Sequence, residues 1–287
     1  MPDTDKDPAP HAERRAYWTE QFDAAYRFMF EAILPYPVAE CGEAMVSLQQ
    51  AAQAADVDVQ FSTTAHVRGL PRLYYLRDGQ IPGFIGAAAE MNERGWVMRV
   101  EDGYRTSEMQ KYLGRTPQVF DAVLRSVMWE LDNELPSPEF MFRRCSALVA
   151  SVPKFGTHMS GSAIDISVMH RDDPVREVDR GAAYLEMSAL TPMASPFVSK
   201  AARRNRQEIT ALMRRHGFVD YPYEFWHYSS GDAYEQVLLK SGRPAIYGAV
   251  QWDADTNRVT PLPQPEQPLN SFDEIRAEIE AALARRR

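Results

Sequence analysis

The sequence predicts an α+β fold in which helices flank a small central sheet. Stretches near both ends of the chain repeat apolar residues at helical spacing, whereas short runs in the middle alternate apolar and polar residues with period two. Gly-containing and Pro-containing turns separate these runs. The 287 residues, 45% apolar and 25% charged, can bury a substantial core in one large domain or two small ones.

The N-terminal part of the chain predicts a tail followed by helices. Residues 1–16 are charged and contain several prolines, which is typical of a mobile tail. Apolar residues at helical spacing then predict one helix over residues 17–34 and another over residues 38–55. We therefore expect residues 17–55 to form a helical extension.

Period-two alternation beside turn residues predicts four strands, at residues 57–61, 73–76, 96–100 and 163–168. In the last of these, the isoleucine and valine side chains share one face and can enter the core, while Asp165 lies on the opposite face and points into a cleft. Gly161, just upstream, permits a tight bend before this strand.

The remaining elements are mostly helical. Residues 107–133 and 200–216 have helical patterns, and the Pro-rich residues 260–268 predict an extended linker. Ser271 and Glu274 make a capping box that begins a final helix. The expected organisation is a mobile tail (1–16), a helical extension (17–55), a main domain (56–247) and a linker with a C-terminal helix (248–287).

Composition argues against several classes of function. The net charge is −8 and the basic residues are scattered, whereas nucleic-acid binding needs a basic face. No apolar run approaches the ~20 residues that span a bilayer, and no secretory signal is visible at the N-terminus. Cys41 and Cys145 are isolated and are expected to be free thiols in a reducing compartment, so we predict a cytoplasmic protein.

Two of the 6 histidines, His158 and His227, stand in segments rich in turn residues and aromatics that also carry a carboxylate. His158 precedes Asp165, and Glu224 stands shortly before His227, in a segment where a turn is expected. Two imidazoles and a carboxylate can hold a catalytic zinc ion, and a second carboxylate can transfer protons. This pattern predicts a zinc peptidase. Spacing alone also fits ordinary buried histidines, because it differs from the common His-Glu-x-x-His zinc helix.

Three motifs stand in order along the chain: Asp102-Gly103-Tyr104-Arg105, His158-x-x-Gly161-x-Ala163-x-Asp165 and Glu224-x-Trp226-His227. Together they resemble the motifs of the D-alanyl-D-alanine dipeptidases of vancomycin resistance. They are also similar to those of the wider group of zinc D,D-carboxypeptidases, whose fold the Hedgehog signalling domain shares. The similarity covers roughly residues 55–240. It implies a small, mostly antiparallel central sheet that bears a zinc site and is flanked by helices.

The resemblance assigns roles to five residues of this chain. His158, Asp165 and His227 would hold one zinc ion per chain. Glu224 matches the catalytic base of the family, and Arg105 matches the arginine near the scissile carbonyl. These roles agree with elementary chemistry, because a carboxylate can take a proton from water and a fixed positive charge can stabilise a developing oxyanion.

The resemblance places substrate contacts at Gly156, Tyr184, Leu185 and Glu186, and here the chain departs from the family. Gly156 stands where the dipeptidases usually have a serine, and Leu185 stands where they have the aspartate that binds the free ammonium of the dipeptide. Glu186 is adjacent, but neighbouring side chains of an extended segment point to opposite sides. Losing such a counter-charge would cost an ammonium substrate about 2–5 kcal/mol.

We therefore expect a metallopeptidase that hydrolyses a D-alanyl-D-alanine-like dipeptide, with Glu224 as general base. Two alternatives remain: a zinc amidohydrolase for another small peptide-like substrate with a blocked amino terminus, and a catalytically silent zinc-binding protein. The expected partner is the small substrate, with neither nucleic acid nor a membrane. The extensions at residues 17–55 and 248–287 could form a homo-oligomer contact.

Overall fold

The computed structural model describes residues 11–286, which form an α+β architecture. Its α-helices are α1 (His11–Arg27), α2 (Leu48–Ala54), α3 (Ile81–Glu93), α4 (Ser107–Leu113), α5 (Pro117–Glu130), α6 (Pro138–Val149), α7 (Lys200–Arg215), α8 (Ala233–Leu238) and α9 (Phe272–Arg285). Its strands are β1 (Met45–Ser47), β2 (Val59–Phe61), β3 (Tyr75–Arg77), β4 (Trp96–Asp102), β5 (Ala163–His170), β6 (Val219–Asp220), β7 (His227–Ser229), β8 (Val250–Asp253) and β9 (Arg258–Pro261). Shorter helical turns are η1 (Phe28–Ile33), η2 (Val67–Gly69), η3 (Asp78–Gln80) and η4 (Pro153–Phe155).

The central sheet has five strands in the order β2-β4-β5-β7-β6. Strands β2 and β4 run parallel, whereas the other neighbouring pairs are antiparallel. The small, mostly antiparallel sheet expected from the sequence is therefore confirmed. Two additional antiparallel pairs join β1 to β3 and β8 to β9.

Strand β5 runs through the middle of this sheet and separates the core from the site. Ile164 and Ile166 are fully buried in an apolar cluster that the sheet shares with helices α3 and α7. Asp165 lies between them in sequence and is the register partner of His227 on β7. On the other side, a register shift between β4 and β5 places Asp102 opposite Asp165. Strand pairing alone thus brings polar residues of three strands together.

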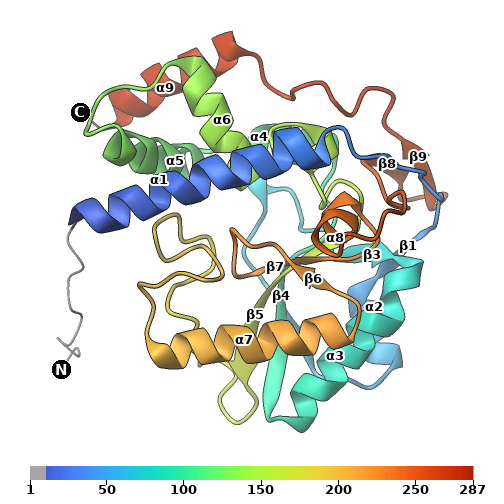
Figure 1. Cartoon of the computed structure of the whole chain (residues 1–287). Helices are drawn as coiled ribbons and strands as arrows, with labels where there is room; N and C mark the ends of the chain where they lie inside the picture. Colours follow the sequence, from blue (N-terminus) through green and yellow to red (C-terminus); the bar gives the residue numbers. More distant parts are fainter. Residues whose placement is uncertain (1–10, 287) are drawn as a thin grey trace.

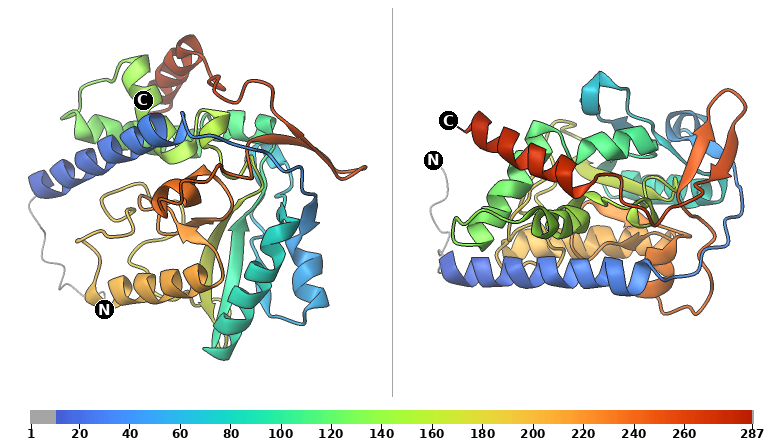
Figure 2. Two further views of the ribbon diagram at one scale, coloured as in Figure 1. Left: turned by 45° about the vertical axis from the view of Figure 1, so that its right-hand side comes forward. Right: turned by 90° about the horizontal axis from the view of Figure 1, so that it is seen from above.

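Two groups of helices lie on either side of the central strands (Figure 1). Helices α1, α5, α6 and α9 pack against one another around an apolar cluster that contains Phe120 and Phe142. Helices α3 and α7 pack together on the other side, around Phe84 and Leu212. The two views in Figure 2 show that helices from the beginning, middle and end of the sequence make up the first group.

The helix predicted for residues 38–55 is wrong in its first half. Residues 45–47 form β1, which pairs with β3, and α2 begins only at Leu48. Ser47 caps α2 by accepting a hydrogen bond from the backbone N–H of Gln50. Gly42 has a φ of +74°, which is outside the helical region and interrupts a helix at this position. The spacing of apolar residues could not reveal a strand whose partner lies much later in the chain.

Helix α1 begins at His11, earlier than the sequence predicted. Of the mobile tail expected at residues 1–16, residues 1–10 lie outside the described chain, and the rest form the first turns of α1. Trp18, near the middle of this helix, is 2% exposed and packs in a small cluster with Ala147 of α6. Burial of such a large side chain explains why the helix is held against the domain.

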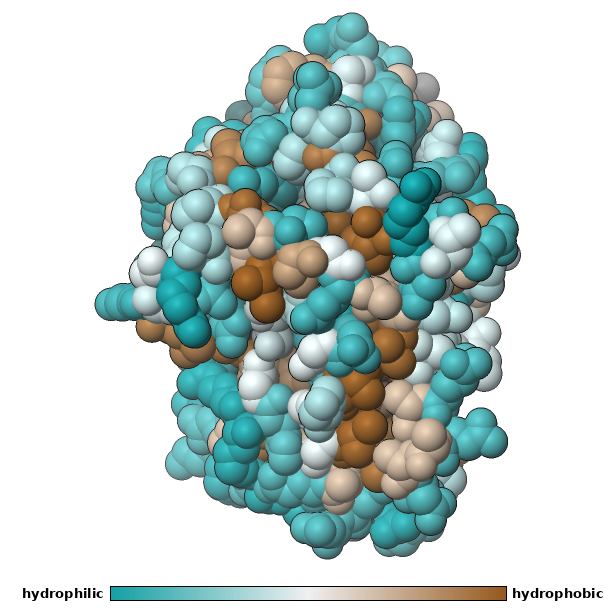
Figure 3. Space-filling model, turned by 90° about the vertical axis from the view of Figure 1, so that its right-hand side faces the viewer, coloured by the Kyte–Doolittle hydropathy of each residue, from teal (hydrophilic) through white to brown (hydrophobic). Residues whose placement is uncertain are grey.

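The surface is mixed in polarity. Figure 3 shows one face on which hydrophilic side chains predominate and apolar ones gather in a band near its middle. Among the helices of residues 11–286, none is both long enough and apolar enough to cross a membrane.

Candidate metal centre and active site

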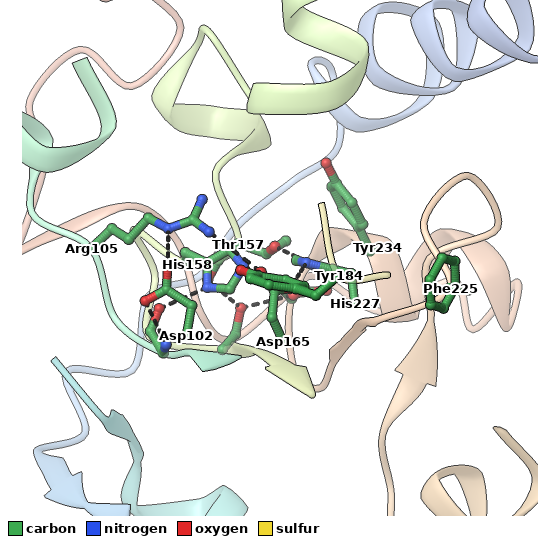
Figure 4. A network of polar contacts seen from close by, with 12 residues as sticks. Asp102, Arg105, Thr157, His158, Asp165, Tyr184, Phe225, His227 and Tyr234 are labelled. Atoms are coloured by element: carbon green, nitrogen blue, oxygen red, sulfur yellow. Dashed lines mark hydrogen bonds and ion pairs between the residues drawn. The ribbon is translucent and has the colours of Figure 1, made fainter. Parts of the chain in front are cut away.

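Three side chains with metal-binding chemistry meet beside strands β5 and β7 (Figure 4). Asp165 belongs to β5 and His227 begins β7, while His158 comes from the loop between η4 and β5. One ligand atom from each residue lies within 4.8 Å of the others, and each residue is at most 5% exposed. The fold therefore brings together the three residues that the sequence analysis expected to hold zinc.

The loop that carries His158 is held in a tight bend. The backbone N–H of Met159 donates to the carbonyl of Gly156 at 2.7 Å, and that of Ser162 donates to the carbonyl of Thr157 at 3.2 Å. Gly161 has a φ of +68°, and a Cβ atom there would lie 2.5 Å from the methyl carbon of Met45. The end of the Met45 side chain is flexible and can shift, but the positive φ favours glycine, which permits the bend as the sequence predicted.

Each histidine is oriented through its second ring nitrogen. Nδ1 of His158 lies 2.7 Å from the carbonyl oxygen of Gly103, and Nε2 of His227 lies 2.9 Å from the hydroxyl of Thr157. Because a carbonyl oxygen only accepts, Nδ1 of His158 carries a hydrogen and Nε2 faces Asp165. Such outer contacts are typical of metal-binding histidines, whose ring orientation and tautomer they fix.

This donor set fits a divalent metal ion. Nε2 of His158 and Nδ1 of His227 lie 3.2 Å and 3.0 Å from the same oxygen, Oδ1 of Asp165. Burial opposes the ionised form of Asp165, yet the two imidazoles hold its pKa well below the usual range. Burial lowers the pKa of His227 and favours its neutral form, although Asp165 opposes this shift. An ionised carboxylate and imidazole nitrogens that converge on one point are the ligands of catalytic zinc sites.

The other oxygen of Asp165 is held from a different direction. The hydroxyl of Tyr184 donates to Oδ2 at 2.9 Å, and Arg105 donates to it through a terminal nitrogen at 3.4 Å (Figure 4). The ring of Tyr184 packs edge-to-face on Trp226, with ring centroids 5.6 Å apart. Tyr184 therefore orients Asp165, and the substrate contact expected of it stays a prediction.

Arg105 is fixed by the turn that ends β4. Its Nε donates to Oδ2 of Asp102 at 2.8 Å, and a terminal nitrogen donates to the side chain of Gln110 at 3.3 Å. Although burial disfavours charge on both groups, each stabilises the other: the pKa of Asp102 is lowered and that of Arg105 is raised. Since Gly103 of the same turn orients His158, one turn positions both Arg105 and a candidate ligand.

Sequence reasoning missed the outer partners of Asp102. Nε2 of His66 lies 3.4 Å and a terminal nitrogen of Arg72 lies 3.2 Å from Oδ2 of this aspartate. The sequence analysis assigned no role to His66, which is 7% exposed. The segment around His66 carries no motif, so the contact is visible only once the chain is folded. Thr157 was also missed, although it stands next to His158, because its role comes from a contact with His227, far along the chain.

Glu224 lies in the turn expected before β7. Its backbone N–H donates to the carbonyl of Tyr221 at 3.2 Å, and its carbonyl accepts from the N–H of His227 at 3.4 Å. Burial raises the pKa of Glu224 well above its usual value, and the nearby charge of Asp165 raises it further, while Arg105 opposes the shift. A buried carboxyl group with a raised pKa is suited to accept and return a proton.

A cavity with a largely apolar wall opens beside these groups. Its charged lining comes from Arg105, Asp165 and Glu224. Two of the expected substrate contacts, Gly156 and Leu185, also line it. Glu186 is not among the residues of the described chain that do so. Its apolar and aromatic members are Met29, Leu113, Val119, Ala147, Leu148, Val149, Ala150, Phe155, Met187, Tyr221, Trp226 and Tyr234. Of these, the sequence analysis had named Trp226 alone, as part of a motif.

Other proteins have sequences similar to the part of the chain that carries these residues. A family model described as D-ala-D-ala dipeptidase (peptidase M15) matches residues 83–241. The chain is similar to the D-alanyl-D-alanine dipeptidase of Escherichia coli, with 30% identity over 115 residues that cover 40% of this chain and 53% of that protein. It is also similar to the D-alanyl-D-alanine dipeptidase of Synechocystis, with 24% identity over 256 residues that cover 76% of this chain and 96% of that protein.

Among solved structures, the chain matches the LdcB LD-carboxypeptidase with a TM-score of 0.36 and 17% identity, over 74% of this chain and 79% of that one. The aligned region of the Escherichia coli protein is about half of its length, and the Synechocystis alignment covers nearly all of its partner. The family match spans more than half of this chain and includes Arg105, His158, Asp165, Glu224 and His227. The chain therefore belongs to the D-ala-D-ala dipeptidase family of peptidases, peptidase M15.

Proposed function

We propose that this protein is a zinc-dependent dipeptidase that hydrolyses the amide bond of a small, D-alanyl-D-alanine-like dipeptide. The observation that carries the proposal is that His158, Asp165 and His227 converge in a cavity that Glu224 and Arg105 also line. The names of the two relatives support the substrate class.

His158, Asp165 and His227 would hold one zinc ion per chain. A bound zinc ion supplies a Lewis acid, which polarises a carbonyl group and makes water more acidic. Gly103 and Thr157 fix the two imidazole rings, and Tyr184 fixes the carboxylate. These contacts hold the three side chains in an orientation suited to bind the ion.

Glu224 acts as the general base. It accepts a proton from the water molecule whose oxygen attacks the carbonyl carbon, and it returns the proton to the amine nitrogen when the carbon–nitrogen bond breaks. Arg105, held in orientation by Asp102 and Gln110, stabilises the negative charge that develops on the carbonyl oxygen.

A catalytically silent zinc-binding protein would have no use for this arrangement. Keeping a carboxyl group as buried as Glu224 beside Asp165 is costly, since burial and the like charge both oppose its ionisation. The cost is understandable if Glu224 transfers protons, and this favours the enzyme over the silent protein.

The test measures hydrolysis and zinc content together. We expect the zinc-loaded protein to cleave a D,D-dipeptide and Glu224→Gln to lose at least about a hundredfold in kcat, as expected for a general base. Its zinc content should stay at one per chain. Glu208→Gln, the same chemical change on an exposed face of α7, is the control and should behave as wild type. Full activity of Glu224→Gln would refute the mechanism.

A further inference from the structure

We infer that the cavity beside the candidate metal centre selects substrates whose amino end is uncharged and whose adjoining side chain is apolar, as in an N-acylated dipeptide. The inference rests on the proposed function, because it concerns the substrate of the same site. It goes further by naming the charge state and the side chain that the cavity accepts.

Asp165 already has other partners and is not available to pair with an ammonium group. Its Oδ1 faces the ring nitrogens of His158 and His227, and its Oδ2 accepts from Tyr184 and Arg105. In the proposed enzyme Oδ1 would bind the metal ion, and Oδ2 already accepts from two donors. An incoming ammonium would therefore have to displace a contact that positions a candidate ligand.

Glu224 is the other carboxyl group among the described residues that line the cavity. The proposed hydrolysis requires Glu224 to exchange protons with water. An ammonium group paired with Glu224 would block that exchange and make the carboxylate a weaker base. A productive complex therefore leaves Glu224 unpaired.

The remaining charge in the cavity repels a cation. Arg105 lines the cavity, and its guanidinium group keeps its positive charge because Asp102 lies 2.8 Å away. A divalent ion held by His158, Asp165 and His227 would add further positive charge. Like charges within a partly desolvated site repel more strongly than they do in water.

The apolar part of the wall comes from several distant segments. Met29 belongs to η1, Leu113 to α4, Val119 to α5 and Leu148 to α6, while Met187 lies in the loop before α7. An ammonium group set against these side chains loses its hydration without gaining a counter-charge. An acyl group or an aliphatic side chain instead buries apolar surface there, which is favourable.

Leu185 offers a matched test of this selection. It lines the cavity, is 42% exposed, and directly follows Tyr184. Its φ is +64°, in the left-handed region that Asn and Asp adopt more readily than Leu. Leu185→Asp therefore adds a carboxylate beside the cavity without added backbone strain, and Leu185→Asn supplies the same shape without the charge.

The experiment compares kcat/KM of the zinc-loaded full chain for D-alanyl-D-alanine, its N-acetyl derivative and N-acetyl-D-leucyl-D-alanine. We expect the N-acetyl derivative to exceed the free dipeptide by at least about tenfold, the cost of an unpaired buried charge. The leucyl compound should exceed the alanyl one by about fivefold, because it buries more apolar surface. Leu185→Asp should lower the first ratio by at least about tenfold, whereas Leu185→Asn should leave it unchanged.

The possible failures are distinguishable. If wild type cleaves the free dipeptide as well as its N-acetyl derivative, or if both Leu185 variants change the ratio equally, the inference is overturned while the proposed hydrolysis stands. If none of the three compounds is cleaved, the proposed function fails. Calorimetric Kd values for the same compounds then decide the inference: tighter binding of the N-acetyl compounds supports it, and equal or weaker binding overturns it. If Leu185→Asp does not fold, the wild-type ratios decide alone.

Discussion

The hydroxyl of Thr157 lies 2.9 Å from Nε2 of His227, so the neighbour of one candidate ligand orients the ring of another. Thr157 belongs to the bend before β5, and His227 begins β7. If Nε2 donates to this hydroxyl, Nδ1 is left as the acceptor that faces Asp165, which is the form that binds a metal ion. The bend and the strand are thereby joined through a single polar contact.

Replacing Thr157 by valine should weaken zinc binding. Valine keeps the shape but cannot accept from His227, and losing such an outer contact typically costs about 10- to 100-fold in metal affinity. Competition against a chelator of known affinity measures the change. Thr157→Ser retains the hydroxyl and should stay close to wild type. Equal losses in the two variants would show that the contact is unimportant.

Arg105→Lys should impair catalysis without releasing the metal. Lysine keeps the positive charge but cannot contact Asp102, Gln110 and Asp165 together as the planar guanidinium group does. We expect kcat/KM to fall by about 10²- to 10³-fold, as when an oxyanion contact is removed. Metal analysis and kinetics are done on the same preparation. Arg204→Lys, on an exposed position of α7, is the control. Loss of zinc from Arg105→Lys would contradict this role.

Glu90 should make stability depend on pH in the acid range. A hydrogen bond from Arg215 is the main reason why the pKa of Glu90 is lowered from 4.5 to about 2. Because the pKa is depressed in the folded state, the ionised group stabilises the fold above about pH 4.5, and this contribution is lost as the pH falls towards 2. Denaturant titrations should show that Glu90→Gln has a lower free energy of unfolding at pH 7 and that its difference from wild type shrinks towards pH 3. A constant difference would contradict the ionic role.

The two cysteines should differ sharply in reactivity. Both are free thiols, as the sequence predicted, but Cys41 is exposed and Cys145 is buried. Burial raises the pKa of Cys145 to about 12, so its reactive thiolate is scarce at neutral pH. A thiol reagent should modify one cysteine quickly in the native protein and both in denaturant, with Cys41→Ser removing the fast phase. Two fast thiols in native protein would refute this. The cytoplasmic location inferred from these cysteines stays a prediction.

Much of the candidate site could be predicted because its residues stand in ordered motifs. The motifs around His158 and Glu224 indicated which side chains would meet, and the alternation of β5 correctly placed Asp165 opposite the buried isoleucines. What the sequence could not supply were contacts between unrelated segments. The role of Gly103 comes from its backbone carbonyl, which every residue type has, and His66 approaches Asp102 from a loop without a pattern.

Local signals also explain which elements were predicted. The capping box of Ser271 and Glu274 does begin α9, and the patterns for β4, β5 and α7 gave their positions closely. The sequence analysis did not identify α3, α6 or the β8–β9 pair. Helix α3 contains two glycines and is rich in small residues, which weakens a helical pattern, and it is stabilised by packing against β4 and α7.

The residues that line the cavity come from inside and outside the part of the chain that matches the family. Among the described residues that line it, Met29 alone lies outside residues 83–241, the part of the chain that matches the family. This methionine comes from η1, which continues the N-terminal helix α1. A segment outside the family match can therefore reshape what the cavity accepts while the residues proposed for zinc binding and proton transfer stay the same.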